Sequence, residues 1–235
     1  KTFFNPTLLA AQVGSDIAAA DLEAKLKDWN DFQFERVGFN LRPELVAVKD
    51  VGGDAAAFAA VAKQVAETSE FNLILMSEDA DVMKAGVEVC AFKRPLMYGA
   101  TDANADAMGA LAKDNDLPLG IKADSIDGLQ PLSEKITGMG IKDLVLDPGS
   151  RDPKQSNQDM IAIRRAALKD SNRAVGFPTI AFPCEMASNL DMEALLAGMF
   201  VAKYGGIVTL SDFSGDSLFP LLLERLNIFT DPQRP

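Results

Sequence analysis

Short apolar or β-branched runs alternate with helix-compatible stretches along the whole chain. Eight such runs occur, at Thr7–Val13, Leu45–Lys49, Leu73–Ser77, Pro95–Gly99, Leu117–Lys122, Asp143–Asp147, Phe177–Phe182 and Gly206–Leu210. A helix-compatible stretch separates each run from the next, and one more follows the last. Repeated strand–helix units are typical of a parallel sheet with helices outside it. Because 235 residues suit eight such units, the pattern predicts a (β/α)8 barrel, also called a TIM barrel.

The helix-compatible stretches begin with capping residues and carry apolar residues at helical spacing. Asp54 precedes Phe58, Val61, Ala62 and Val65, which recur at the spacing of one helical face. Further helix starts are predicted at Asp79 or Asp81, at Asn104, and at Asn189 or Asp191. The last helix is expected over Leu218–Leu226, where Pro220 is tolerable only near the first turn.

The first repeat is the least regular part of the pattern. A predicted helix, Ala20–Asp28, is followed by an additional β-like run, Phe34–Asn40, before the run at Leu45–Lys49. This run is either an extra strand or hairpin, or the true second strand of the sheet. If it is extra, it is also a candidate surface for docking a partner.

Composition excludes several classes of function. Acidic residues number 34 against 23 basic ones, and a net charge of −11 disfavours contact with nucleic-acid phosphates. The chain lacks histidine, which rules out histidine-based zinc sites and catalytic triads within it. Two isolated cysteines, Cys90 and Cys184, fit a reducing cytoplasm. No apolar run reaches the roughly 18 residues that a membrane span needs.

The ends of the chain resemble cut points. The chain starts at Lys1 rather than Met, and it closes on the proline-rich stretch Asp231–Pro235. We therefore expect a barrel domain over residues 1–229, followed by the start of a linker at 230–235. The chain is interpreted as one domain of a longer polypeptide.

Polar loops follow the predicted strands and would form the functional mouth of the barrel. The sharpest local signal is Asp147-Pro148-Gly149-Ser150 at the end of a strand. A carboxylate at Asp147 could hydrogen-bond the paired N–H groups of a ligand such as a pterin ring. The alternative is turn chemistry alone, because Pro148 presets φ and Gly149 permits positive φ.

Lys122 and Cys184 also stand at strand ends. A lysine there can form a Schiff base if its pKa is depressed, but Asp124 lies nearby and favours a salt-bridged lysine. A nucleophilic thiol at Cys184 needs a base or a cation beside it, whereas Glu185 is its neighbour, which favours an inert thiol. Cys90 is expected in the core.

Several acidic residues of the loops could ligate a hard cation through oxygen, namely Asp79, Asp102, Asp124 and Asp212. They come from different loops, so solvated loop acids are the simpler interpretation. The residues alone therefore give a barrel with no catalytic or metal-binding set. That result favours a scaffold or binding role.

The chain resembles a known family in seven segments spread from near its start to its end. They are Phe34–Gly38, Asn72–Met76, Arg94–Thr101, Leu144–Gly149, Ile163–Arg165, Pro178–Phe182 and Thr230–Gln233. Their order and spacing are similar to the central barrel of the large, or gamma, subunit of the corrinoid iron–sulfur protein. That subunit belongs to the acetyl-CoA decarbonylase/synthase system of the reductive acetyl-CoA pathway.

The resemblance implies a methyl carrier rather than a self-sufficient enzyme. The family's large subunit has an N-terminal [4Fe-4S] domain, the barrel, and a C-terminal corrinoid-binding domain, and it pairs with a small subunit. Cobalt accepts a methyl group from a methyltetrahydrofolate- or pterin-dependent methyltransferase and delivers it to acetyl-CoA synthase, the partner of CO dehydrogenase. The cluster serves reductive reactivation of the cobalt.

This chain departs from the full family pattern. It lacks the four-cysteine cluster motif, and the corrinoid domain would begin after Pro235. No catalytic, cofactor-binding or metal-binding residue is therefore carried over, and the barrel is expected to be a scaffold. The weak candidates at the mouth are Asp147, Ser150, Lys122 and Asp124. The alternatives are a pterin-binding methyltransferase or synthase that uses Asp147, and a lyase that uses Lys122.

Overall fold

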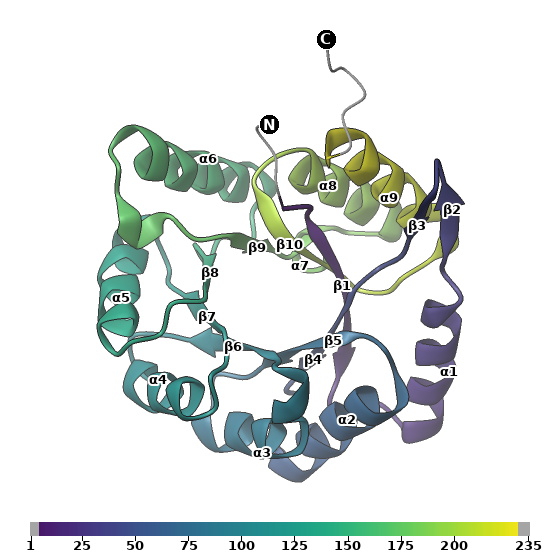
Figure 1. The fold of residues 1–235 in the computed structure, drawn as a ribbon, viewed down its shortest axis with the longest axis horizontal. Coiled ribbons are helices and arrows are strands. Elements are labelled where there is room, and N and C mark those ends of the chain that lie inside the picture. Colours follow the sequence, from purple (N-terminus) through teal and green to yellow (C-terminus); the bar gives the residue numbers. More distant parts are fainter. Residues whose placement is uncertain (1–4, 230–235) are drawn as a thin grey trace.

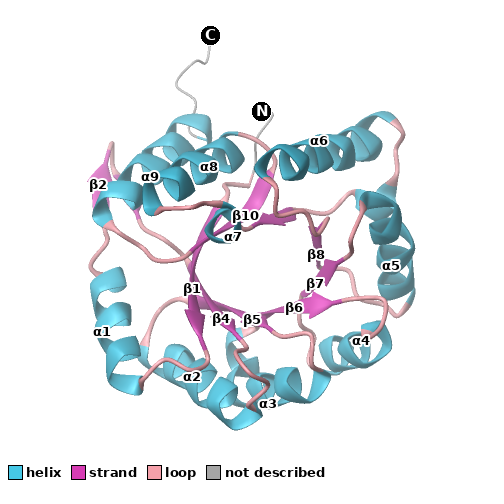
Figure 2. Ribbon diagram, turned by 180° about the vertical axis from the view of Figure 1, so that it is seen from behind, coloured by secondary structure: helices cyan, strands magenta, loops and turns pink. Residues whose placement is uncertain are grey.

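A computed structural model shows eight parallel strands closed into a barrel and surrounded by helices (Figures 1 and 2). The structure describes residues 5–229, so the expected linker at 230–235 lies outside the described residues. The barrel strands are β1 (Leu8–Gly14), β4 (Leu45–Lys49), β5 (Asn72–Met76), β6 (Leu96–Ala100), β7 (Leu119–Lys122), β8 (Leu144–Asp147), β9 (Thr179–Ala181) and β10 (Gly205–Leu210). Strand β1 pairs with both β10 and β4, which closes the ring and confirms the predicted (β/α)8 barrel.

Helices follow the strands in sequence, and all but the short α7, which lies at the end of the ring beside β10, cover the outside of the barrel (Figure 2). They are α1 (Ala19–Asn30), α2 (Ala55–Thr68), α3 (Ala80–Cys90), α4 (Ala105–Asp114), α5 (Ile126–Gly138), α6 (Pro153–Lys169), α7 (Pro183–Met186), α8 (Leu190–Ala202) and α9 (Gly215–Phe229). Two 3-10 turns, η1 (Ala91–Lys93) and η2 (Arg173–Val175), complete the connections. Within residues 5–229, no helix is both long enough and apolar enough to cross a bilayer.

Three strands begin one residue after a proline. Pro95, Pro118 and Pro178 stand directly before β6, β7 and β9, although the sequence pattern placed each proline inside its strand. Proline has no N–H to donate to a strand ladder. The carbonyls of Pro118 and Pro178 still accept hydrogen bonds, from the backbone N–H groups of Met97 and Leu146.

The irregular first repeat is a hairpin outside the barrel. Strands β2 (Phe34–Arg36) and β3 (Phe39–Leu41) pair antiparallel, so the second barrel strand is β4 rather than this run. The turn places Val37 and Gly38 at positive φ, the conformation of tight hairpin turns. The Phe34 ring packs on Phe219 of α9 with 4.9 Å between ring centroids, which holds the hairpin against the last helix.

Strand alternation divides the buried residues into an inner and an outer core. Leu9, Ala11 and Val13 of β1 face the helices, whereas Leu8 and Ala10 face the barrel interior. The same period of two turns the last residues of β4, β5, β7 and β8, namely Lys49, Met76, Lys122 and Asp147, inward at the carboxyl end. The candidate site is therefore expected among the inward-facing residues at the carboxyl ends of the strands.

Helix caps gather at the same end of the barrel. Side chains of Asp54, Asp79, Ser125, Asp152 and Asn189 accept backbone N–H groups at the starts of α2, α3, α5, α6 and α8. The caps of α3 and α8 are therefore Asp79 and Asn189 rather than Asp81 and Asp191. Every connection that follows a barrel strand carries an acid, and these include Asp16, Asp50, Glu78, Asp102, Asp124, Asp152, Glu185 and Asp212.

Two predictions about helix starts need correction. Asn104 stands before α4, but its side chain binds the backbone of Thr101, Glu78 and Gly99 instead of capping the helix. Helix α9 begins at Gly215, three residues before the predicted start, because the Ser214 carbonyl already accepts the N–H of Leu218. Pro220 consequently lies in the second turn.

Arg225 of α9 fastens the last helix to the first strands. The side chain is 9% exposed, and it donates to the Glu44 carboxylate at 2.7 Å and to the carbonyls of Thr7 and Arg42. Glu44 in turn accepts the backbone N–H of Leu9 at 3.2 Å. The buried ion pair therefore joins α9, β1 and β4 at the end of the barrel opposite the mouth.

Replacing Arg225 by Met should destabilise the fold by about 3–5 kcal/mol, because it leaves the Glu44 carboxylate without its buried cation. The measurement is urea unfolding followed by circular dichroism. Arg164→Met, at an exposed position of α6, is the control and should change stability by under about 0.5 kcal/mol. Equal stability of the two variants would contradict a stabilising role for the contacts of Arg225 with Glu44, Thr7 and Arg42.

Candidate functional site

A cavity of about 240 Å³ opens at the carboxyl end of the strands. It is lined by Lys49, Asp50, Met76, Ser77, Glu78, Tyr98, Gly99, Lys122, Arg151 and Glu185. These residues come from β4 to β7 and from the connections after β8 and β9. The cavity lies where a (β/α)8 barrel places its functional residues.

Asp147 ends β8 and reaches this mouth, as the sequence predicted. Its side chain is 2% exposed, and Oδ1 accepts the N–H of Gly149 at 2.8 Å. Gly149 has a φ of +82°, and a Cβ there would stand 2.2 Å from the carbonyl oxygen of Ala123. The turn at Pro148-Gly149 therefore needs glycine, and it turns the carboxylate inward.

Tyr98 and Arg151 occupy the remaining acceptor positions of Asp147. The Tyr98 hydroxyl donates to Oδ2, and the Arg151 guanidinium donates to both carboxylate oxygens at 2.9 and 3.1 Å. Burial, and then the Asp147 charge, raise the pKa of the Tyr98 hydroxyl, so it stays protonated. Burial lowers the pKa of Arg151, but the hydrogen bond and charge of Asp147 outweigh it and the net pKa is raised. Arg151 also lies 4.4 Å above the Phe182 ring.

Glu185 of α7 extends these contacts across the mouth. Its carboxylate accepts from Lys49 at 2.8 Å and from Arg151 at 2.5 Å, and these cations come from different sides of the barrel. Burial raises the pKa of Glu185, but hydrogen bonds and charges from Lys49 and Arg151 outweigh it and lower the pKa. Tyr98, Asp147, Arg151, Glu185 and Lys49 form one continuous set of contacts, called here the mouth network.

The other mouth candidates lie apart from this network. Lys122 ends β7 and forms an ion pair with Glu78 at 2.7 Å rather than with Asp124. Asp124 is exposed and does not line the cavity. Ser150 is half-buried, and its carbonyl accepts from Arg151 at 3.3 Å. The structure thus brings Lys122 to the cavity, places Asp147 behind the lining residues Tyr98 and Arg151 that contact it, and leaves Asp124 outside.

The cysteines are held as thiols. Burial, followed by the charges of Glu185 and Glu193, raises the pKa of Cys184 to about 12, and burial alone raises that of Cys90 to about 12. A thiolate at neutral pH is therefore disfavoured at both positions. Cys90 packs in the outer core, as expected, and Cys184 packs against the inner one.

The four loop acids proposed as cation ligands do not converge. Asp79 caps α3, and Asp212 accepts from Trp29 at 2.7 Å and from Lys25. Over residues 5–229, no three histidine, cysteine or acidic side chains are grouped in a way that could hold a metal. Asp79 and Asp212 therefore serve local structure.

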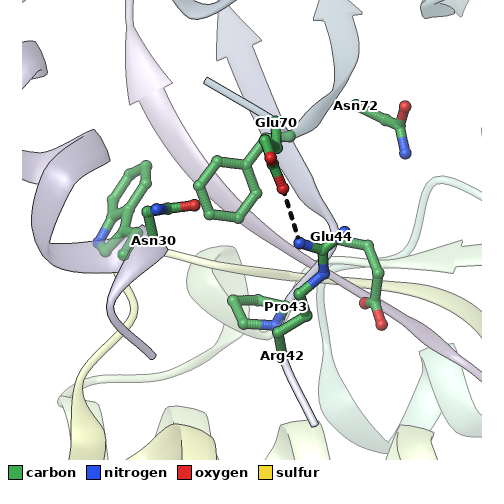
Figure 3. Close-up of a pocket in the computed structure, with 8 residues that line it drawn as sticks. Asn30, Arg42, Pro43, Glu44, Glu70 and Asn72 are labelled. Carbon is green, nitrogen blue, oxygen red and sulfur yellow. Dashed lines mark hydrogen bonds and ion pairs between the residues drawn. The ribbon is translucent and has the colours of Figure 1, made fainter. Parts of the chain in front are cut away.

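A second, smaller cavity lies at the opposite end of the barrel, where β4 and β5 begin (Figure 3). It has a volume of about 50 Å³, and the Arg42–Glu70 ion pair at 2.9 Å crosses it. Trp29 and Phe71 form much of its wall, with their rings edge to face at 6.5 Å. This end of a (β/α)8 barrel serves stability rather than chemistry.

The mouth network is chemically saturated. Asp147 accepts hydrogen bonds from Tyr98, Gly149 and Arg151, and Glu185 accepts from Arg151 and Lys49. Because these donors occupy both carboxylates, neither is free to act as a general base. The roles of Tyr98 and Lys49 were not predicted from the sequence. The available signal was their parity, because both are polar residues at inward positions near the carboxyl ends of strands.

Glu185→Gln should lower the thermal midpoint at neutral pH, because it removes the shared counter-charge of Lys49 and Arg151. The folded pKa of Glu185 lies below its usual 4.5, so the stabilisation is present above pH 4.5 and is lost as pH falls through the folded pKa. The Tm difference from wild type should therefore shrink below pH 4.5. Glu88→Gln, at an exposed carboxylate of α3, is the control; a Tm difference for Glu185→Gln that stays constant down to pH 3 would contradict the assignment.

Solved structures with this fold include dihydropteroate synthases. The enzyme of Vibrio fischeri ES114 superimposes with a TM-score of 0.70 at 12% identity, covering 98% of this chain and 95% of that one. The Coxiella burnetii enzyme in complex with pteroic acid gives 0.68 at 9% identity, covering 97% and 95%. At such low identity the likeness concerns the fold alone.

Sequence relatives cover the whole chain. The family model of the CO dehydrogenase/acetyl-CoA synthase delta subunit matches residues 1–235. The corrinoid/iron-sulfur protein large subunit of Moorella thermoacetica is 40% identical over 100% of this chain and 52% of its own length. Acetyl-CoA decarbonylase/synthase complex subunit gamma 1 of Methanosarcina mazei is 33% identical, again over 100% and 52%. The chain thus spans about half the length of the curated relatives it matches, and it belongs to the CO dehydrogenase/acetyl-CoA synthase delta subunit family, alongside corrinoid/iron-sulfur protein large subunits.

Proposed function

We propose that this chain is the barrel scaffold of a corrinoid iron–sulfur methyl carrier. In this role the carrier accepts a methyl group on cobalt from a methyltetrahydrofolate- or pterin-dependent methyltransferase and delivers it to acetyl-CoA synthase. The observation that carries the proposal is the match of the whole chain to corrinoid/iron-sulfur protein large subunits. The barrel supplies a rigid body between the parts that hold cofactors.

The mouth network supports a scaffold over a catalyst. The buried carboxylate of Asp147 and the more exposed carboxylate of Glu185 are neutralised by hydrogen bonds and ion pairs to Tyr98, Arg151 and Lys49. A general acid or base needs a proton site that the substrate can reach. Here the contacts join β4, β6, β8 and α7, so their effect is to hold the strand ends together.

The residues of the barrel do not fit the two cofactors of the proposed carrier. A [4Fe-4S] cluster takes four thiolates, whereas Cys90 and Cys184 lie in the outer and inner core respectively. The mouth cavity of about 240 Å³ is below the range of pockets that enclose drug-sized ligands, and a corrinoid is larger still. We therefore assign both cofactors to parts of the protein outside this barrel.

The proposal includes partners and a location. The relatives named as subunits of an acetyl-CoA decarbonylase/synthase complex support an assembly with other subunits. We propose a small subunit as the heterodimer partner, with the methyltransferase and acetyl-CoA synthase/CO dehydrogenase as transient partners. Two thiols at separate positions fit a cytoplasmic location.

Replacing Asp147 by Asn tests the alternative of a pterin-binding enzyme. Because Tyr98, Gly149 and Arg151 already fill the acceptor positions of Asp147, we expect no saturable binding of methyltetrahydrofolate by calorimetry in wild type or variant. Asp124→Asn is the control at an exposed mouth acid. Binding by wild type that Asp147→Asn weakens and Asp124→Asn preserves would favour the enzyme.

Native mass spectrometry of the protein isolated from its source tests the carrier directly. The expected species is a one-to-one complex of two different chains that retains one corrinoid and one iron–sulfur cluster. Visible absorption of the same sample should show the corrinoid. A lone chain of 25.2 kDa without cofactor or partner would overturn the proposal.

A further inference from the structure

Helix α8 carries apolar side chains on its outer face as well as on the face that packs on the barrel. Met192, Leu195 and Met199 recur at i, i+3 and i+7, so they lie along one side of the helix. Leu195 is 68% exposed, Met192 is exposed and Met199 is half-buried. Glu193 is the one charged residue between positions 192 and 202, and it is buried. The outer face of α8, defined here by Met192, Leu195 and Met199, therefore presents apolar side chains and no charge.

Helix α6 shows the ordinary pattern of an outer helix. Its exposed Leu168 stands among the charged residues Arg164, Arg165 and Lys169. A helix that is apolar on all sides is normally buried on all sides, and a contiguous exposed apolar face marks a contact surface. Helix α8 lies beside α9 on the outside of the ring (Figures 1 and 2). Residues 5–229 thus leave the outer face of α8 uncovered.

Glu224 of α9 stands at the edge of this face without a counter-ion. Gly198 is the neighbour of Leu195 on the surface of α8, and a Cβ added at Gly198 would stand 3.1 Å from Glu224 Oε2. The carboxylate therefore lies close over the backbone of α8. Burial raises the pKa of Glu224, and no cation or hydrogen-bond donor among residues 5–229 offsets that effect. A cation supplied from outside would stabilise this half-buried carboxylate.

The charge at this edge distinguishes between possible occupants. A purely apolar partner would bury Glu224 further without a counter-charge, which is costly. A second copy of this chain, at a twofold contact, would present the same face with its own Glu224 and a net charge of −11. A different chain that carries a lysine or arginine among apolar side chains complements both features. The relative named as a subunit of a complex supports a different chain as the partner.

We propose that the outer face of α8, with Glu224 of α9 at its edge, docks the small subunit through an apolar surface that carries one lysine or arginine. Apolar side chains of the partner cover Met192, Leu195 and Met199, and its cation pairs with Glu224. The contact surface is distinct from the mouth network. This inference rests on the proposed carrier function, because that function supplies the second chain.

The affinity between the two chains tests the apolar part of the face. Dilution of the purified full-length complex, followed by mass photometry, gives its Kd. Leu195→Asp places a charge against an apolar partner surface and should raise Kd by at least about tenfold. Leu168→Asp, on α6 at a similar exposure of 64%, is the matched control and should leave Kd unchanged. Circular dichroism checks that both variants keep the wild-type fold.

Glu224→Gln tests the cation of the partner. The variant keeps the shape of the side chain and removes its charge, so Kd should rise and should depend less on salt than in wild type. Glu88→Gln, at an exposed carboxylate of α3, is the control and should keep the wild-type Kd and salt dependence. Wild-type affinity and salt dependence in Glu224→Gln would overturn the proposal.

The same measurements separate a failure of this inference from a failure of the proposed function. A heterodimer that retains its corrinoid, and whose Kd does not change in Leu195→Asp, overturns the docking face and leaves the carrier function standing. Homodimers of this chain that Leu195→Asp disrupts overturn the choice of partner. A wild-type protein with neither a second chain nor a corrinoid overturns both proposals.

Discussion

Closure of the barrel is the constraint on which the rest of the structure depends. Strand β1 is the only connection between the end and the beginning of the ring in residues 5–229, because it pairs with β10 on one side and β4 on the other. Backbone pairing alone leaves the last helix unattached. The buried leucines of α9 and the contacts of Arg225 with Glu44 and with the Thr7 carbonyl attach it. The contact between Arg225 and Thr7 joins residues 218 positions apart in sequence.

At the carboxyl end of the barrel, the mouth network joins separate elements as the contacts of Arg225 do at the opposite end. Asp147 and Glu185 each accept from Arg151, which places one guanidinium between two carboxylates. Such an arrangement is stable only when every member is satisfied, because a buried charge without its partner is costly. The network therefore fixes the positions of the loops at the carboxyl end of the barrel relative to one another.

Much of the fold was predictable from sequence, and the limits have physical causes. The strand–helix alternation predicted the barrel, since period and turn signals are local. Strands β6, β7 and β9 begin later than predicted, each directly after a proline. Proline lacks the N–H that strand pairing needs, and the pattern of apolar residues does not take this into account. Asp147 was predicted as a mouth residue because the turn that follows it, Pro148-Gly149, can be recognised in adjacent residues of the sequence. Tyr98 and Lys49 were missed because their contacts with Asp147 and Glu185 join strands remote in sequence.

The one-sided placement of the helix caps has a consequence for the electric field of the molecule. Helices α2, α3 and α6 start beside the mouth, where the side chains of Asp54, Asp79 and Asp152 accept their first N–H groups. The fold thus concentrates acidic side chains at the carboxyl end of the barrel, whether or not that end binds a ligand. An anionic group that approaches within about 8–10 Å at physiological ionic strength is repelled there, and a cationic surface is turned toward that end before it touches.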